Sequence, residues 1–219
     1  MGEPDEVLRV KRQVVETARA LLRTGLVEGT AGNLSARLPD GRVVLTPSSL
    51  DYEQMEVADL VVTDLEGQVL EGERAPTTEK ALHLACLRRY PELGGVIHSH
   101  ALHASMFAVT RQPIPCVVEE FQVYVGGEVP VAEYRLTGSD ELGEEVARHV
   151  EHRAAVLMAN HGLLTVGRDV GEAFRVACLV ERTARLVWGA RQLGPLVPLP
   201  EETLKRFEPI YGLMRRRKA

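Results

Sequence analysis

Cysteine is scarce in this chain. Its 219 residues include three cysteines, Cys86, Cys116 and Cys178, which are far apart and form no Cys-x-x-Cys pair. An odd and widely spaced set does not provide a disulfide framework. We therefore expect buried thiols in a reducing environment, which favours a cytoplasmic location.

Long apolar runs and an excess of positive charge are also absent. No stretch reaches the roughly 20 apolar residues that a membrane-spanning helix needs, and the first ten residues lack the basic start and apolar core of a signal peptide. The net charge of -5 disfavours general binding to nucleic acid or anionic membranes. We expect neither as a partner, and we expect the basic run at residues 215–218 to be solvated.

The hydrophobic content, 45%, is enough to bury a sizeable core. We expect one domain over residues 1–219, with a C-terminal tail from about residue 195. Periodicity predicts helices at 5–23, 76–89, 101–109, 139–152, 171–191 and from 202 onward. It predicts strands at 34–37, 43–46, 59–63, 68–70, 95–100, 155–159 and 163–166, with short or edge strands within 112–133. This order indicates an α/β fold in which helices cover a mixed sheet.

Three histidines are the first candidates for chemistry. His98 and His100 are two apart in an apolar strand, so their side chains share a face. His161 lies in an Asn-His-Gly turn after a second apolar strand, beside one of the chain's two asparagines. Three protein ligands with an open position are typical of catalytic zinc, and other first-row divalent ions also accept imidazole. The pair alone is compatible with ordinary strand residues. The other histidines in helical patterns, His83, His149 and His152, are expected to be packed or surface residues.

Five short motifs extend this pattern, and they occur in a fixed order. They read Gly-Thr-Ala-Gly-Asn-Leu-Ser at 29–35, Leu-Thr-Pro-Ser-Ser at 45–49, Thr-Thr-Glu at 77–79, His-Ser-His at 98–100 and Asn-His-Gly at 160–162. Together they resemble the class II aldolase/adducin family, and within it the branch that cleaves L-fuculose 1-phosphate, over roughly residues 5–190. The resemblance implies a three-layer α/β/α fold with a central, mostly antiparallel mixed sheet. It also implies a homotetramer whose active sites lie between subunits.

The resemblance also implies roles for individual residues. The ligands of a divalent metal ion, most typically zinc, would be His98, His100, His161 and Glu79, and Glu79 would also be the catalytic base. A phosphorylated sugar would be held through its phosphate by Thr30, Gly32, Asn33, Ser48, Ser49, Thr77 and Thr78. Hydroxyls, an amide and N–H groups at a helix start are suitable donors to phosphate. Without the resemblance, Thr77 and Thr78 would be read as an ordinary helix cap.

The implied reaction is the reversible cleavage of a ketose 1-phosphate into dihydroxyacetone phosphate and a short aldehyde, through an enediolate. A metal ion would stabilise the enediolate as a Lewis acid, and Glu79 would move the proton. The family uses a tyrosine from a neighbouring subunit on the aldehyde side, in the region that corresponds to residues 115–127. No tyrosine of this chain falls at the expected place. The candidates for this proton donor are Glu119, Glu120, Tyr124 and Tyr211, the last by its distance from the C-terminus.

Two alternatives remain open. L-Ribulose-5-phosphate 4-epimerases share the fold, the metal and the retro-aldol chemistry, as do other sugar-phosphate lyases of the family. That epimerase branch has an aspartate at the position of Glu79 and uses a C-terminal histidine, whereas no histidine follows His161 here. An adducin-like interaction module would keep the fold without metal chemistry, and the presence of all three histidines with Glu79 argues against it.

Overall fold

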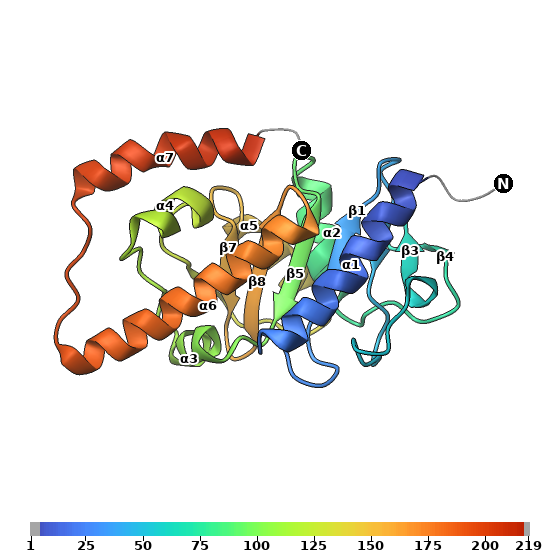
Figure 1. Ribbon diagram of the computed structural model, residues 1–219, viewed down its shortest axis with the longest axis horizontal. Helices are drawn as coiled ribbons and strands as arrows, with labels where there is room; N and C mark the ends of the chain where they lie inside the picture. Colours follow the sequence, from blue (N-terminus) through green and yellow to red (C-terminus); the bar gives the residue numbers. More distant parts are fainter. Residues whose placement is uncertain (1–4, 217–219) are drawn as a thin grey trace.

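The computed structural model describes residues 5–216, and a central eight-stranded sheet runs through them with helices on both faces (Figure 1). The strand order is β4-β3-β2-β1-β5-β8-β7-β6. Neighbouring strands are antiparallel except β6 and β7, which are parallel. The predicted mixed, mostly antiparallel sheet is confirmed. The strands are β1 (Asn33–Arg37), β2 (Val43–Leu45), β3 (Val61–Thr63), β4 (Val69–Glu71), β5 (Gly95–Ser99), β6 (Val131–Ala132), β7 (Ala155–Met158) and β8 (Gly162–Gly167).

The helices form the two outer layers. On one face α1 and α6 cross the sheet with α3 beside α6, and on the other α2 packs against α5 (Figure 1). At one end of the molecule, α4 packs against α7. The α-helices in the described part are α1 (Asp5–Arg23), α2 (Lys80–Arg89), α3 (Leu102–Thr110), α4 (Glu119–Val125), α5 (Asp140–His149), α6 (Val170–Leu193) and α7 (Glu201–Arg216), with a 3-10 turn η1 (Val57–Asp59). This is the α/β/α architecture that the resemblance implied.

The predictions of α1 and the central strands from sequence periodicity are confirmed, because the apolar spacing within each segment matches the faces that it buries. Val14, Ala18 and Leu21 lie on one face of α1 and are fully buried, and Gly25, with φ +70°, ends the helical path. Every residue of β5 and β8 is buried, since helices cover both faces of these two strands.

The β-like prediction for residues 112–133 is wrong over its middle part, which forms α4. Its valines and aromatic residues favour strands in isolation. In the fold, Phe121 and Val125 are one helical turn apart and face the core, while Glu120 and Tyr124 face outward. Gly126, in the left-handed region with φ +91°, ends the helix. Only β6 and an isolated bridge near residue 114 retain the expected extended pairing in this region of the described chain.

The helix predicted from Pro76 begins at Lys80 instead. Pro76 forms an isolated antiparallel bridge with Pro47, and the Thr77 N–H donates to the Thr46 carbonyl at 3.1 Å. These contacts tie residues 76–77 to the end of β2. They also move Glu79 from the helix interior to the position directly before the first turn of α2.

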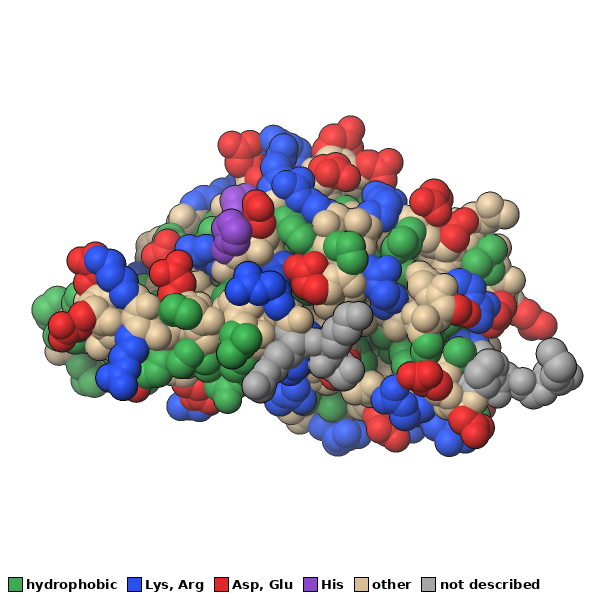
Figure 2. All heavy atoms as spheres, turned by 90° about the horizontal axis from the view of Figure 1, so that it is seen from above, with side chains coloured by type: hydrophobic (Ala, Val, Ile, Leu, Met, Phe, Trp, Pro, Cys, Tyr) green, Lys and Arg blue, Asp and Glu red, His purple; other side chains and the backbone are tan. Residues whose placement is uncertain are grey.

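The expectation that the basic C-terminal run is solvated needs a correction at Arg215. Figure 2 shows acidic and basic side chains intermingled over one face of the molecule. Arg215 is not solvated: its side chain is 9% exposed, and it donates to Glu92 at 3.2 Å and to the Arg153 carbonyl at 2.9 Å. Residues 217–218 of the run lie outside the described residues. Among the helices of residues 5–216, none combines the length and apolar character required to cross a membrane.

The N-cap of α5 provides a test of the local structure. Ser139 Oγ accepts a hydrogen bond from the Leu142 N–H at 3.1 Å. Replacing Ser139 by Ala is expected to lower the free energy of unfolding by about 1 kcal/mol, whereas Ser139→Asp keeps the cap and most of the stability. Urea denaturation of the three proteins measures the difference. Equal midpoints for Ser139→Ala and the parent would contradict the cap.

Candidate metal centre

Neighbouring antiparallel strands bring the candidate residues to one edge of the sheet. Asn33 at the start of β1 pairs with His98 near the end of β5. His100 directly follows β5, and His161 directly precedes β8, whose first residues pair with the last residues of β5. Antiparallel pairing places the end of one strand beside the start of the next. Side chains that are far apart in the sequence therefore meet here.

The three histidine side chains converge at this edge. Their ligand-capable nitrogen atoms lie within 4.8 Å of one another, and the Nε2 atoms of His98 and His100 are 3.1 Å apart. His98 is fully buried, His161 is half-buried and His100 is exposed. The cluster is therefore anchored in the core and open on one side.

The carboxylate of Glu79 completes the cluster. Its Oε2 atom is 3.3 Å from His98 Nε2, and its Oε1 atom is 3.2 Å from His161 Nε2. Asn33 Nδ2 donates to Oε2 at 2.8 Å. Glu79 is buried, and its place before the first turn of α2 puts a negative charge at the positive end of the helix dipole.

These separations fit a bound divalent ion. Two ligands of tetrahedral zinc, with bonds of about 2.0–2.1 Å, lie about 3.3 Å apart, and the separations here are 3.1, 3.3 and 3.2 Å. His98 Nδ1 is 3.1 Å from the Leu163 carbonyl, and donation to it leaves Nε2 free as a ligand. Glu79 Oε1 is buried and accepts no hydrogen bond from any described residue. The histidine trio can therefore hold a metal ion, with Glu79 beside it.

The protonation states also suit metal ligation. Burial lowers the pKa of His98 to about 3. His100 is exposed on one side, but the side of its ring that faces the protein is partly withdrawn from water, and this partial desolvation together with the neighbouring His161 lowers the pKa of His100 as well. Burial by itself would raise the pKa of Glu79, but the contacts of this carboxylate with His161, His98 and Asn33 outweigh that effect and lower its pKa to about 2. At pH 7 His98 and His100 are thus neutral and Glu79 is ionised, which are the forms that bind metals.

Gly162 makes room for the imidazole rings. A Cβ atom on Gly162 would lie 2.6 Å from the Ser99 carbonyl oxygen, and 3.1 and 3.2 Å from ring carbons of His100 and His98. A larger residue would displace the backbone or the two rings. The glycine of the predicted Asn-His-Gly turn is therefore required to avoid a steric clash with the neighbouring backbone and the two rings.

The residues expected to bind phosphate come from three adjoining loops. The loop after β2 is joined to β1 by the Thr46 N–H, which donates to Leu34 at 3.0 Å, and to residues 75–77 by two further backbone hydrogen bonds. Thr30, Ser49 and Thr78 are exposed, and Gly32 and Ser48 are half-buried. The hydroxyl groups among them lie at the surface, beside the strand ends that carry the histidines.

Two members of that set are engaged inside the protein. The Thr77 N–H, expected to face an anion, donates instead to the Thr46 carbonyl, and Thr77 Oγ1 accepts from the Glu79 N–H at 3.2 Å. The amide of Asn33 contacts Glu79 through Nδ2 and His83 through Oδ1. Asn33 and Thr77 are buried and support Glu79 in this structure.

His83 was expected from the sequence to be a packed or surface residue; it is packed, and only its link to the site was missed. It is fully buried on α2, with Nε2 2.6 Å from Asn33 Oδ1 and Nδ1 2.9 Å from Ser35 Oγ. The sequence did contain an indication of the link between His83 and Glu79. His83 follows Glu79 by four positions, and residues four apart in a helical segment lie on the same side of it.

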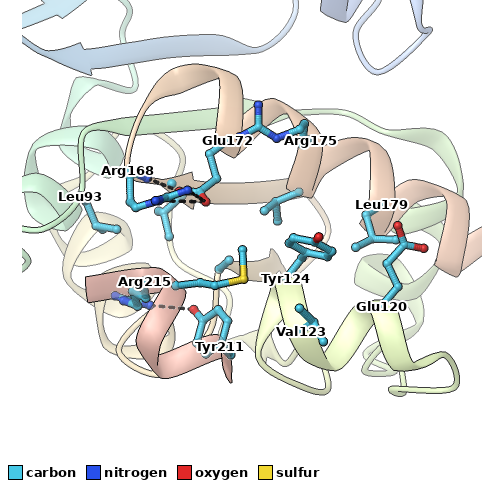
Figure 3. A pocket seen from close by; sticks show the side chains of 15 residues that line it. Leu93, Glu120, Val123, Tyr124, Arg168, Glu172, Arg175, Leu179, Tyr211 and Arg215 are labelled. Carbon is cyan, nitrogen blue, oxygen red and sulfur yellow. Dashed lines mark hydrogen bonds and ion pairs between the residues drawn. The ribbon is translucent and has the colours of Figure 1, made fainter. Parts of the chain in front are cut away.

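Tyr211 lies at the opposite end of the sheet. It is buried, its hydroxyl is 3.1 Å from Arg215 Nη1, and it lines a cavity of about 310 Å³ among α4, α6 and α7 (Figure 3). Gly167, the last residue of β8, also lines this cavity, whereas His161 precedes the first residue of β8. Within one chain, the structure does not bring Tyr211 to the histidines.

The other candidates for the proton donor also lie away from the cluster. Glu119 and Glu120 occupy the exposed first turn of α4, and Tyr124 is 46% exposed on the same helix. Glu120 and Tyr124 line the cavity that contains Tyr211 (Figure 3). All four candidates therefore belong to the α4–α7 end of the molecule.

Comparisons with known proteins found a matching family model and several similar proteins. Residues 12–188 match the family model described as Class II Aldolase and Adducin N-terminal domain. L-Ribulose-5-phosphate 4-epimerase UlaF of Salmonella paratyphi B is 37% identical over 199 residues, which cover 85% of this chain and 87% of that protein. A solved L-fuculose 1-phosphate aldolase is 33% identical with a TM-score of 0.89, covering 97% of this chain and 98% of the other. YgbL of Klebsiella pneumoniae is 27% identical with a TM-score of 0.83, covering 91% and 98%.

Metal binding can be tested directly. The parent protein is expected to bind one zinc ion per chain. Replacing His98 by Gln removes a ligand and is expected to weaken zinc binding by at least about 100-fold. This is more than the loss of a residue that only hydrogen-bonds to a ligand typically costs. Elemental analysis after dialysis and calorimetric titration measure this, with the exposed His152→Gln as the control. Undiminished binding by His98→Gln would disprove the site.

The buried histidines predict an acid dependence of stability in the metal-free protein. Burial lowers the pKa of His83 to about 4 and that of His98 to about 3, whereas in the unfolded chain both return to about 6.5. The unfolded state thus binds more protons as the pH falls from about 6.5 to 5. Each histidine is expected to reduce the free energy of unfolding by up to about 1.4 kcal/mol per pH unit. Urea unfolding in chelator should show this slope, and a flat profile would contradict it.

Proposed function

The chain belongs to the class II aldolase and adducin family, and we propose that it is a zinc-dependent aldolase acting on a ketose 1-phosphate of the L-fuculose 1-phosphate type. Reversible carbon–carbon cleavage yields dihydroxyacetone phosphate and a short aldehyde. The 33% identity and near-complete overlap with a solved L-fuculose 1-phosphate aldolase support this choice within the family.

The placement of Glu79 carries the proposal. Both of its carboxylate oxygens contact the histidine cluster, one of them accepts no hydrogen bond from a described residue, and the group is ionised at pH 7. A carboxylate placed in this way can take a proton from the carbon that becomes nucleophilic and return it in the reverse direction. A purely structural metal site does not need a base of this kind.

Cleavage leaves a negatively charged enediolate, which the site must stabilise. A divalent ion held by His98, His100 and His161 supplies Lewis-acid stabilisation when bound. Asn33 holds Glu79 in place, and the exposed side of His100 leaves a path for the substrate. Lys80 does not provide a Schiff base at this edge, because its Nζ donates to the Gly67 carbonyl at 3.0 Å.

The hydroxyls of Thr30, Ser48, Ser49 and Thr78 are proposed to anchor the phosphate, with Gly32 allowing close approach of the backbone. Neutral donors of this kind hold an anion without cancelling its charge. Gly32 adopts φ +79°, and a Cβ there would lie 2.8 Å from the His98 carbonyl oxygen. The loop that would hold the phosphate is thus packed directly on the strand that carries His98.

A homotetramer with active sites between subunits is part of the proposal. Leu193 and Val197 are 94% and 85% exposed, and Figure 2 shows apolar side chains gathered toward the end of the molecule that carries the loop between α6 and α7. Such side chains favour contact with another subunit. In this assembly the proton donor on the aldehyde side comes from a neighbouring chain, from Glu119, Glu120, Tyr124 or Tyr211.

Replacing Glu79 by Gln tests the proposed mechanism. The substitution keeps the size of the side chain and removes the base, so the rate of cleavage is expected to fall by about 100- to 10,000-fold. A coupled assay for dihydroxyacetone phosphate with L-fuculose 1-phosphate measures the rate, and Glu66→Gln in the exposed β3–β4 turn is the control. Full activity of Glu79→Gln, or activity of the parent after complete metal removal, would disprove the mechanism.

An L-ribulose-5-phosphate 4-epimerase is the second candidate, favoured by the 37% identity to UlaF. An epimerase and an aldolase can share the same bond cleavage and differ in whether the aldehyde leaves or rejoins in the other orientation. Incubation with L-ribulose 5-phosphate separates the two. Formation of the 4-epimer without free dihydroxyacetone phosphate from any ketose 1-phosphate would favour the epimerase.

A further inference from the structure

A buried chain of hydrogen bonds leads from the body of the protein to Glu79. Ser35 Oγ is 2.9 Å from His83 Nδ1, His83 Nε2 is 2.6 Å from Asn33 Oδ1, and Asn33 Nδ2 is 2.8 Å from Glu79 Oε2. Ser35 and His83 are 0% exposed and Asn33 is 4% exposed. The chain therefore ends at the cluster and does not reach solvent through these residues.

The position of His83 is unusual for a polar side chain. The other buried residues of α2 are Ala81, Leu82, Leu84, Ala85, Cys86 and Leu87. An imidazole in such a place costs free energy unless both ring nitrogens are hydrogen-bonded, and an apolar residue of similar size would pack there without that requirement. Asn33 and Ser35, two apart on one face of β1, satisfy the two nitrogens.

The charge on Glu79 sets the direction of every bond in the chain. An ionised carboxylate only accepts, so Asn33 must present its NH2 group to Glu79 and its carbonyl oxygen to His83. His83 must then carry its hydrogen on Nε2, and Nδ1 accepts from the Ser35 hydroxyl. The reverse arrangement would place two acceptor oxygens 2.8 Å apart. Burial lowers the pKa of His83 to about 4, which keeps the ring neutral.

We propose that His83 is a positioning residue for the base. Supported by Ser35, it fixes the amide of Asn33 so that Glu79 is held in one orientation toward the histidine cluster. The catalytic consequence rests on the proposed function, whereas the hydrogen-bond arrangement does not. Loss of a residue that orients a metal ligand or its neighbour through hydrogen bonds typically costs about 10- to 100-fold in activity.

Three substitutions on α2 test the catalytic part. His83→Leu keeps the bulk and leaves Asn33 Oδ1 without a donor, so kcat is expected to fall by about 10- to 100-fold, with little change in KM. His83→Gln can still donate to Asn33 and is expected to recover most of this loss. Leu84→Ala, one residue along the same helix, should lower stability and leave kcat unchanged. Equal loss of kcat in Leu84→Ala and His83→Leu would show a merely structural role and overturn the proposal.

A double-mutant cycle tests whether His83 acts through Asn33. If it does, Asn33→Ala combined with His83→Leu is expected to have the kcat of Asn33→Ala alone, because the second substitution has nothing left to disturb. Independent, multiplicative losses in the double variant would overturn the proposal.

The tautomer of His83 provides a readout that needs no activity. Nitrogen-15 NMR of the histidine-labelled, metal-free protein is expected to show His83 with its hydrogen on Nε2, and this signal should change in Asn33→Ala. A hydrogen on Nδ1 would overturn the arrangement. If the Nε2 form is found while the parent cleaves no ketose phosphate, the aldolase proposal fails and the positioning of Glu79 by His83 stands.

Discussion

The buried negative charge of Glu79 is the constraint on which the site depends. A carboxylate removed from water is costly unless donors and positive potential surround it. The register of β1 against β5 supplies the amide of Asn33 as a donor to the carboxylate, and the start of α2 supplies the favourable end of a helix dipole. Ring nitrogens of His98 and His161 lie 3.3 and 3.2 Å from the two carboxylate oxygens, so a divalent cation held between them would supply the remaining positive charge.

The features predicted correctly from the sequence depend on local rules. Strand alternation and the order of apolar segments were sufficient for a mixed sheet and for placing His98 and His100 on one face. That His161 joins them was a hypothesis from its turn after an apolar strand, and the motif resemblance strengthened it. The features that were missed depend on long-range contacts. Packing against α7 and a glycine end make α4 a helix despite its valines, and the Pro47–Pro76 bridge delays the start of α2. His83 gains its partners only because α2 lies against one particular face of β1.

The two parts of the proposed chemistry lie at opposite ends of the strands. The end that carries His98, His100 and His161, here called the histidine edge, would stabilise the negative charge that develops when a carbon–carbon bond breaks. Both an aldolase and a 4-epimerase require this stabilisation. The α4–α7 end carries the groups that would meet the aldehyde, and it is the part that sequence patterns described least well. The residues that would stabilise the enediolate and those that would meet the aldehyde thus lie in different parts of the chain. Similarity to both a 4-epimerase and an aldolase is therefore expected, because the two activities share only the first set.

The composition of the histidine edge also fixes its electrostatic balance. Metal ligation requires neutral imidazoles, so with its one ionised carboxylate the site would carry minus one, and a divalent cation would leave plus one. When Glu79 takes a proton from the substrate carbon, the charge of its carboxylate disappears as that of the enediolate appears, so the total stays at plus one. A carboxylate in place of His161 would remove this surplus positive charge, and a neutral residue in place of Glu79 would double it before the reaction began. The proposed proton transfer therefore moves one elementary charge within the site without changing its total, and the same surplus positive charge faces the substrate before and after the step.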